Sequence, residues 1–172
     1  QFIKAIANLW QFGKEKVLSP ESPFTFLGLD WVQRSDGGIY LMQERFTKEL
    51  LEKYGMAQCK PAKSVSLDRP LTEDDIPSPD QLRELQAFAG AFNWLATRTR
   101  PDVAYFTSLL ASSASKQAAW SKELAHKILR YLAGTASQGL LLSADGSEDD
   151  LRVYTDAGFA GAATQSQNGL VI

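Results

Sequence analysis

The chain has 172 residues, a formal net charge of −2 at pH 7, and 44% hydrophobic and 22% charged residues. These totals are ordinary for a globular protein with a buried core, and they exclude a basic field that would attract nucleic acid over the whole surface. The single cysteine excludes an internal disulfide and favours a reducing compartment. No apolar run reaches the length of a membrane span, so we expect no membrane partner.

The first predicted elements are a helix and a β-hairpin. Apolar residues recur at helical spacing in residues 1–12, and Gly13 ends that run. Over 25–33, an alternation of faces that puts Leu27, Leu29 and Trp31 on one side predicts one strand, and a second strand is expected over 39–42. The sequence DGG at 36–38 predicts the hairpin turn between them, because glycine accepts the positive φ that such turns require.

Two helices separated by a linker follow. Helical spacing predicts a helix over 43–54, with Gly55 as its C-cap. Residues 65–79 are acidic, contain prolines and carry few large apolar side chains, as expected of a linker. The sequence SPDQ at 78–81 combines an N-cap serine, a proline at the first helical position and a glutamine suited to a capping box. A strongly periodic helix is therefore expected over 81–97.

The helical pattern is interrupted once and then resumes. Pro101 cannot continue a helix and restricts the residue before it, so a corner is expected there. Asp102 follows at a new helix N-terminus, where a carboxylate suits the free N–H groups. Further helices are predicted over 101–110 and 120–134. Trp94, before the corner, is interpreted as a core side chain, with base stacking as the less favoured alternative.

The last part of the chain is predicted to be extended. Residues 138–143 are interpreted as a strand, 145–150 as an acidic turn, and 151–156 as a strand that ends on a carboxylate. Residues 168–172 are interpreted as a further strand, cut in its middle. We therefore expect this chain to be a piece of a longer protein.

Short sequences spread along the chain resemble, in the same order, parts of the Pol polyproteins of copia-type LTR retrotransposons. They are FLGLDW at 26–31 with IYLMQ at 39–43, MAQCKP at 56–61, LATRTRPDVAY at 95–105, KILRYLAGT at 127–135 and YTDAGFAG at 154–161. Each is short, but their shared order over nearly the whole chain makes a chance match improbable.

This resemblance implies a mixed α/β (α+β) fold. Reverse-transcriptase thumb-like and connection-like helices would accompany a primer-grip-like β-hairpin, followed by the first strands of an RNase H-like mixed sheet. By the same resemblance, residues 1–66 are the end of the palm, the hairpin and the thumb, and 67–80 are an acidic linker. Residues 81–137 are a helical connection segment, and 138–172 are the truncated N-terminal part of an RNase H-like domain.

The resemblance also implies residues that contact a template-primer or an RNA–DNA hybrid. In the primer-grip-like hairpin these are Phe26, Leu27 and Gly28, since a glycine lets a sugar-phosphate backbone approach closely. Spacing alone favours the alternative that Gly28 relieves packing beneath a helix. Generic phosphate contacts are expected from three lysines, namely Lys53, Lys60 and Lys63. For each lysine the alternative is a solubilising surface charge.

One carboxylate is a candidate for catalysis. By the resemblance, Asp156 is the first of the RNase H carboxylates that bind two Mg²⁺ ions in the intact parent enzyme, where paired metals stabilise the attacking and leaving oxygens. Gly158 and Phe159 stand where the family has Asp and Trp. A single carboxylate cannot hold two metals, so we expect this chain to bind no Mg²⁺ stably.

The function implied is that of a fragment of a retrotransposon RNA-directed DNA polymerase and ribonuclease H that keeps parts for holding template-primer. The polymerase signature Tyr-x-Asp-Asp is absent from this sequence, so no turnover is expected from the chain alone. The alternative is a non-catalytic nucleic-acid-binding or interaction module derived from a decayed retroelement. The expected partner besides nucleic acid is the remainder of the Pol polyprotein. The expected location is intracellular, in cytoplasmic virus-like particles, in the nucleus, or in both.

Overall fold

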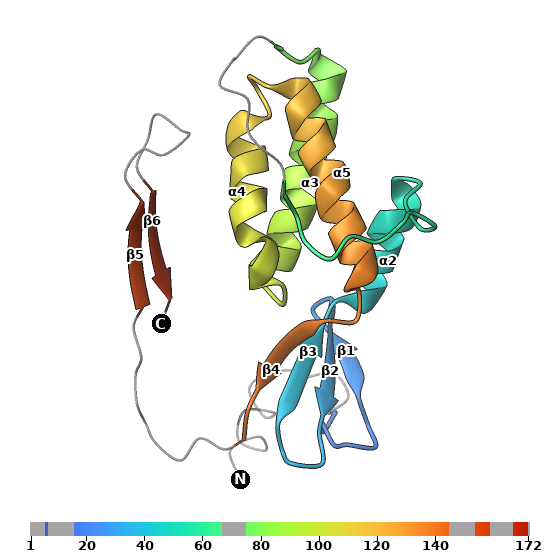
Figure 1. Cartoon of the computed structure of the whole chain (residues 1–172). Coiled ribbons are helices and arrows are strands. Elements are labelled where there is room, and N and C mark those ends of the chain that lie inside the picture. Colours follow the sequence, from blue (N-terminus) through green and yellow to red (C-terminus); the bar gives the residue numbers. More distant parts are fainter. Residues whose placement is uncertain (1–5, 7–15, 67–74, 145–153, 159–166, 172) are drawn as a thin grey trace.

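The structure is a computed structural model that describes residues 6, 16–66, 75–144, 154–158 and 167–171 (Figure 1). Its strands are β1 (Phe24–Phe26), β2 (Leu29–Gln33), β3 (Ile39–Met42), β4 (Gly139–Leu142), β5 (Tyr154–Gly158) and β6 (Gln167–Val171). Its helices are α2 (Glu44–Lys53), α3 (Pro79–Ala96), α4 (Ala104–Ser113) and α5 (Ala118–Gly134), with a short 3₁₀ helix η1 (Pro101–Val103). The expectation of a mixed α/β fold is confirmed at this level.

The helices begin and end where local chemistry predicts. The hydroxyl of Ser78 accepts the N–H of Gln81 at 3.3 Å, and the Gln81 side chain accepts the N–H of Ser78 at 2.8 Å, so the predicted capping box is present. Gly55, with φ of +67°, follows α2 in the left-handed conformation that ends helices. The predicted corner at Pro101 is confirmed by η1, which separates α3 from α4.

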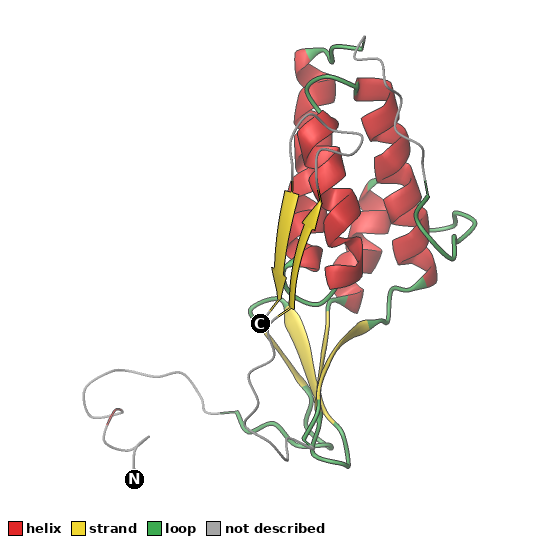
Figure 2. Cartoon of the chain, turned by 60° about the vertical axis from the view of Figure 1, so that its left-hand side comes forward, coloured by secondary structure: helices red, strands yellow, loops and turns green. Residues whose placement is uncertain are grey.

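The hydrophobic core lies between α3, α4 and α5, with α2 packed against α5. Figure 2 shows this helical bundle standing above the four-stranded sheet. The largest side chains with almost no exposure are Leu85, Phe88, Phe92, Leu95, Leu110, Leu124, Ile128, Leu129 and Leu132. The ring of Tyr54, just after α2, stacks on Phe88 with centroids 4.0 Å apart. Packing between helix faces therefore carries most of the apolar burial of the described residues.

The sheet is antiparallel, in the order β1-β2-β3-β4. The turn between β2 and β3 is confirmed at the DGG sequence, where Gly37 has a φ of +88° and Asp36 accepts the N–H of Gly38. β4 confirms the strand expected over 138–143, and its partner is β3, in a register that pairs Met42 with Gly139. A strand that we had assigned to the RNase H-like segment therefore completes the sheet of the hairpin. The proposed domain boundaries stay predictions.

The strand predicted over 25–33 is wrong in one respect, because the chain reverses inside it. Leu27 and Gly28 both have positive φ, of 51° and 75°, and β1 pairs back on β2 with Phe26 opposite Leu29. Two consecutive positive φ values are typical of the type I′ turn, whose twist suits a two-residue hairpin. The FLG sequence is thus the tip of a hairpin and not the middle of a strand.

Some predictions fall outside the described residues. They are the N-terminal helix apart from residue 6, the linker over 67–74 and the acidic turn at 145–150. In the part of the chain that is described, β5 and β6 form an antiparallel pair that places Asp156 opposite Gly169. The predicted strand over 151–156 is therefore confirmed for 154–156. No helix of the described ranges has both the length and the apolar character to cross a membrane.

Candidate nucleic-acid interface

The hairpin tip presents apolar side chains to solvent and touches the helical bundle. Phe26 is 56% exposed and Leu27 72% exposed. A Cβ atom built on Gly28 would lie 3.6 Å from Cζ2 of Trp94, so the backbone at the tip packs beside the C-terminal half of α3. The structure is therefore compatible with both the packing role and the ligand-binding role given to this hairpin. Gly28 lies against a helix, as the packing alternative requires, while Phe26 and Leu27 remain open to a ligand.

One face of α3 continues the surface of this tip. Residues Gln86, Gly90, Trp94 and Arg98 follow one another at intervals of four, which places them along one side of the helix and its C-terminal turn. Gln86, Gly90 and Arg98 are exposed and Trp94 is half-buried. The guanidinium carbon of Arg98 lies 4.8 Å from the centroid of the Trp94 ring. We call these four residues the α3 stripe.

Gly90 is the least expected member of the α3 stripe. A glycine in the interior of a helix costs about 1 kcal/mol relative to alanine. In the described part of the chain, no heavy atom lies within 4 Å of a Cβ built at Gly90, so neighbouring side chains do not require a glycine there. The position is therefore open for the close approach of a molecule from outside the chain.

The three predicted lysines lie elsewhere on the surface. Lys53 ends α2 with its ammonium 5.1 Å from the ring of Tyr54, and Lys60 and Lys63 are exposed in the following loop. The Lys60 carbonyl accepts Nε of Arg130 at 2.8 Å, so this loop lies along α5. No hydrogen bond or ion pair among the described residues joins these lysines to the hairpin tip. Their role in binding stays a prediction.

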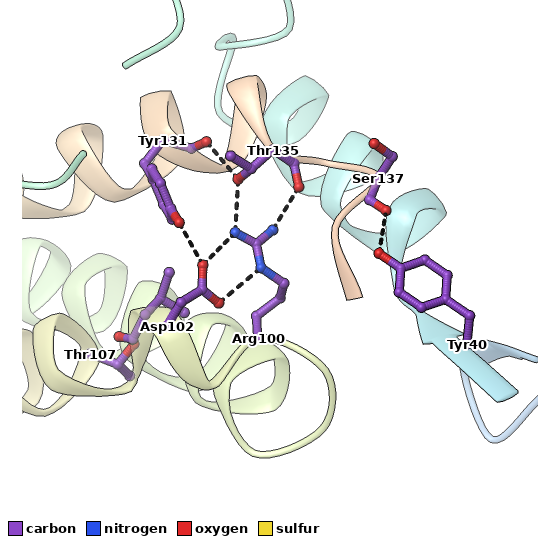
Figure 3. Close-up of polar contacts among 8 residues, drawn as sticks. Tyr40, Arg100, Asp102, Thr107, Tyr131, Thr135 and Ser137 are labelled. Carbon is purple, nitrogen blue, oxygen red and sulfur yellow. Dashed lines mark hydrogen bonds and ion pairs between the residues drawn. The ribbon is translucent and has the colours of Figure 1, made fainter. Parts of the chain in front are cut away.

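A partly buried polar junction, with Arg100 at its centre, connects the bundle to the sheet (Figure 3). Arg100, whose side chain is 3% exposed, donates from Nε and Nη2 to the two carboxylate oxygens of Asp102, at 3.0 and 2.8 Å. It also donates to the carbonyl and the hydroxyl of Thr135, at 2.8 and 2.7 Å. The hydroxyl of Tyr131 donates to Asp102 at 2.7 Å.

The ionisation of this junction follows from its contacts. Partial burial of Asp102 would raise the pKa of its carboxyl, but hydrogen bonds from Arg100 and Tyr131 outweigh it and hold that pKa below its ordinary value. The hydrogen bond to Asp102 raises the pKa of the Tyr131 hydroxyl. Asp102 is therefore a carboxylate that pairs with Arg100. The predicted place of Asp102 in the first turn of a helix is confirmed, and the structure adds two charge-assisted hydrogen bonds from Arg100 that the sequence did not indicate.

The sequence did not indicate part of the candidate interface or part of the junction. Trp94 is interpreted from it as a core side chain and Arg98 is not singled out, although the four-residue spacing from Gly90 is visible in the sequence. Arg100 serves there only to place the corner. Its link with Thr135 joins positions 35 residues apart, for which a single sequence gives no signal.

The candidate metal ligand Asp156 is described only by its backbone position in β5. Within the described ranges, no three His, Cys, Asp or Glu side chains come together as a metal site would require. Two-metal chemistry needs several carboxylates at one place. The described residues alone therefore do not supply the carboxylates that a pair of Mg²⁺ ions requires.

Comparison with known proteins gives several relatives that are parts of mobile elements. The Pol polyprotein of transposon RE2 from Arabidopsis thaliana is 30% identical over 86% of this chain, and that of RE1 is 29% identical over the same share. This chain is a homologue of copia-type retrotransposon Pol polyproteins. The resemblance noted in the sequence is thereby confirmed.

The chain spans only a small part of the length of the Pol polyproteins that it matches. The match covers 10% of the RE2 and RE1 polyproteins. An uncharacterised mitochondrial protein of Arabidopsis thaliana, AtMg00810, is 26% identical over 81% of this chain and 57% of its own length. A putative transposon Ty5-1 protein of Saccharomyces cerevisiae is 31% identical over 77% of this chain and 43% of its own length. No protein-family model and no solved structure matches the chain.

Proposed function

We propose that this chain is the template-primer-holding part of a retrotransposon RNA-directed DNA polymerase and ribonuclease H. One observation carries the proposal: the exposed hairpin tip packs beside the α3 stripe, with Gly28 next to Trp94. Homology to Pol polyproteins supports it, since template-primer is the substrate such an enzyme must hold. In this proposal 1–66 are the end of the palm, the hairpin and the thumb, 81–137 are a connection segment, and 138–172 begin an RNase H-like domain.

The chemistry of the α3 stripe suits a nucleic acid. Gly90 leaves room for sugar atoms to approach the helix, while the half-buried Trp94 offers an aromatic face for a base or a ribose. Arg98, held over that ring, can also donate to a phosphate. Phe26 and Leu27 would contact the same strand from the hairpin tip. Lys53, Lys60 and Lys63 would add generic phosphate contacts, whose strength falls as salt rises.

Catalysis is assigned to the intact parent and not to this chain. We propose that Asp156 supplies one carboxylate of an RNase H-like site, which Mg²⁺ would occupy only when the remaining ligands of the polyprotein are present. A Mg²⁺-dependent nuclease activity of the chain alone that is lost in Asp156→Ala would contradict this. The departures at Gly158 and Phe159 favour a second candidate, a non-catalytic binding or interaction module derived from a decayed element.

The deciding experiment is binding of an RNA–DNA hybrid, measured by fluorescence anisotropy over a series of salt concentrations. We expect the affinity to fall as salt rises and to drop about tenfold in Arg98→Gln, as for the loss of one charge-assisted contact. Trp94→Leu should lower the affinity with little change in the salt dependence, because it removes a stacking surface and no charge. The matched control is Arg34→Gln, an exposed arginine at the β2–β3 turn, which should bind as the parent does.

The outcomes separate the candidates. Salt-sensitive binding that requires Arg98 and Trp94 supports the template-primer proposal. Binding that is equally weakened by Arg34→Gln indicates general charge attraction and contradicts the α3 stripe. An absence of hybrid binding by the folded chain contradicts the proposal and favours an interaction module.

A further inference from the structure

The two chain connections between bundle and sheet are held by adjacent residues. Thr99 and Arg100 lie just beyond the C-terminal turn of α3 and are 1% and 2% exposed. Thr99 holds the connection from β3 into α2, because its hydroxyl donates to Oε1 of Gln43 at 2.9 Å. Arg100 holds the connection from α5 into β4 through its two bonds to Thr135. β3 and β4 are neighbours in the sheet, so Thr99 and Arg100 hold the chain next to two adjacent strands.

Further contacts are found at both connections. The amide nitrogen of Gln43 has no partner within the described residues, so Thr99 is the side-chain partner that the structure shows for that buried amide. On the other strand, the hydroxyl of Tyr40 donates to the carbonyl of Ser137 at 3.2 Å (Figure 3). A Cβ atom at Gly139 would collide with the carbonyl of Leu41, so the main chains of β3 and β4 lie close together at this position.

The same dipeptide is hydrogen-bonded to the end of α3, next to the α3 stripe. The N–H groups of Thr99 and Arg100 both donate to the carbonyl of Leu95, at 3.0 and 2.9 Å. Leu95 is fully buried next to Trp94 in the helix. The position of the sheet relative to α3, and hence of the hairpin tip relative to Trp94, therefore depends on Thr99 and Arg100.

We propose that Thr99 and Arg100 are positioning residues that set the orientation of the β1–β4 sheet on the helical bundle and so align the hairpin tip with the α3 stripe. Neither residue contacts nucleic acid in this account, because both are buried. The inference about orientation stands on the contacts above, whereas its effect on binding rests on the proposed function. The two parts can be tested separately.

The orientation is measured with pairs of nitroxide labels in the full chain carrying Cys59→Ser. One pair joins the sheet to the bundle, at the exposed residues Ser35 and Ala87, and a reference pair lies within the bundle, at Ala87 and Ala111. We expect one narrow distance for each pair in the parent. Thr99→Val and Arg100→Lys should shift or broaden the sheet–bundle distance and leave the reference distance unchanged.

Thr107→Val is the matched control. Thr107 is also a buried threonine, but its hydroxyl donates to the carbonyl of Val103 within its own helical segment. It should leave both distances as in the parent. Circular dichroism at the temperature of measurement establishes that each variant is folded. If Arg100→Lys fails to fold, Thr99→Val, which removes only one hydroxyl, still tests the proposal.

Hybrid binding then tests the consequence for function. We expect Thr99→Val and Arg100→Lys to lower the affinity by about tenfold, similar to the loss of one buried hydrogen bond, with an unchanged salt dependence. Unchanged distances in folded variants would overturn the positioning role. Altered distances with parental affinity would overturn its link to binding. Altered distances in a chain whose parent binds no hybrid would support the positioning role and overturn only the proposed function.

Discussion

Arg100 and Asp102 face each other through two parallel hydrogen bonds, although only Pro101 separates them in the chain. Asp102→Ala would leave the 3%-exposed guanidinium without its charge partner, so we expect the free energy of unfolding to fall by about 2 kcal/mol. Urea denaturation measures this value. The control is Glu49→Ala, which breaks an exposed pair with Arg45 and should cost less than about 0.5 kcal/mol. Equal costs would show that the junction is no stronger than a surface ion pair.

The Asp102 carboxylate should make the free energy of unfolding depend on pH. The pKa of Asp102 is lower in the folded chain than in the unfolded chain, so its contribution is fully present above the unfolded pKa, near 4. That contribution is lost as pH falls through the folded value. We expect Asp102→Asn to lack this part of the acid dependence. Urea midpoints between about pH 2 and pH 7 measure it, and parallel curves for parent and variant would contradict the assignment.

The capping box should stabilise α3 measurably. Ser78→Ala removes the oxygen that accepts the N–H of Gln81, and we expect a loss of about 1 kcal/mol in the free energy of unfolding. Ser78→Gly should cost only a few tenths of that, since glycine tolerates the N-cap conformation. Thermal unfolding followed by circular dichroism measures both. A loss in Ser78→Gly as large as that in Ser78→Ala would contradict the capping role.

Substitution of Gly90 should change stability and hybrid binding in opposite directions. Because a Cβ at Gly90 meets no described atom within 4 Å, Gly90→Ala should raise the free energy of unfolding by about 1 kcal/mol while weakening hybrid binding. Gly55→Ala is the contrasting variant. It should destabilise the chain because Gly55 has a φ of +67°. Stronger hybrid binding by Gly90→Ala would contradict a close approach of nucleic acid at this position.

Much of the helical structure could be predicted because its signals are local. The capping box at Ser78, the glycine after α2 and the proline at 101 each act within one helical turn, and the structure confirms all three. The turn at Leu27 could not be predicted. A leucine with positive φ is uncommon, and alternation of side chains continues through the turn as if the strand did not end.

The site was harder to predict than the fold because its contacts are long-range. Gln43 and Thr99 are 56 positions apart, and Tyr40 and Ser137 are 97 apart. Nothing in the local sequence marks either pair. For Asp102, the local rule placed the carboxylate correctly in the first turn of a helix. It gave no sign of the side-chain hydrogen bonds from Arg100 and from Tyr131 of α5.

The pairing of β4 with β3 also constrains how the chain folds. It joins residues 39–42 to residues 139–142, with α2 to α5 in the intervening segment. Closing so long a loop before the helices pack would be entropically costly, so we expect the bundle to form first and the sheet to gain its fourth strand late. Until then the main chain of β3 has a free edge. During synthesis on the ribosome, that interval is when the chain is most exposed to strand-mediated aggregation.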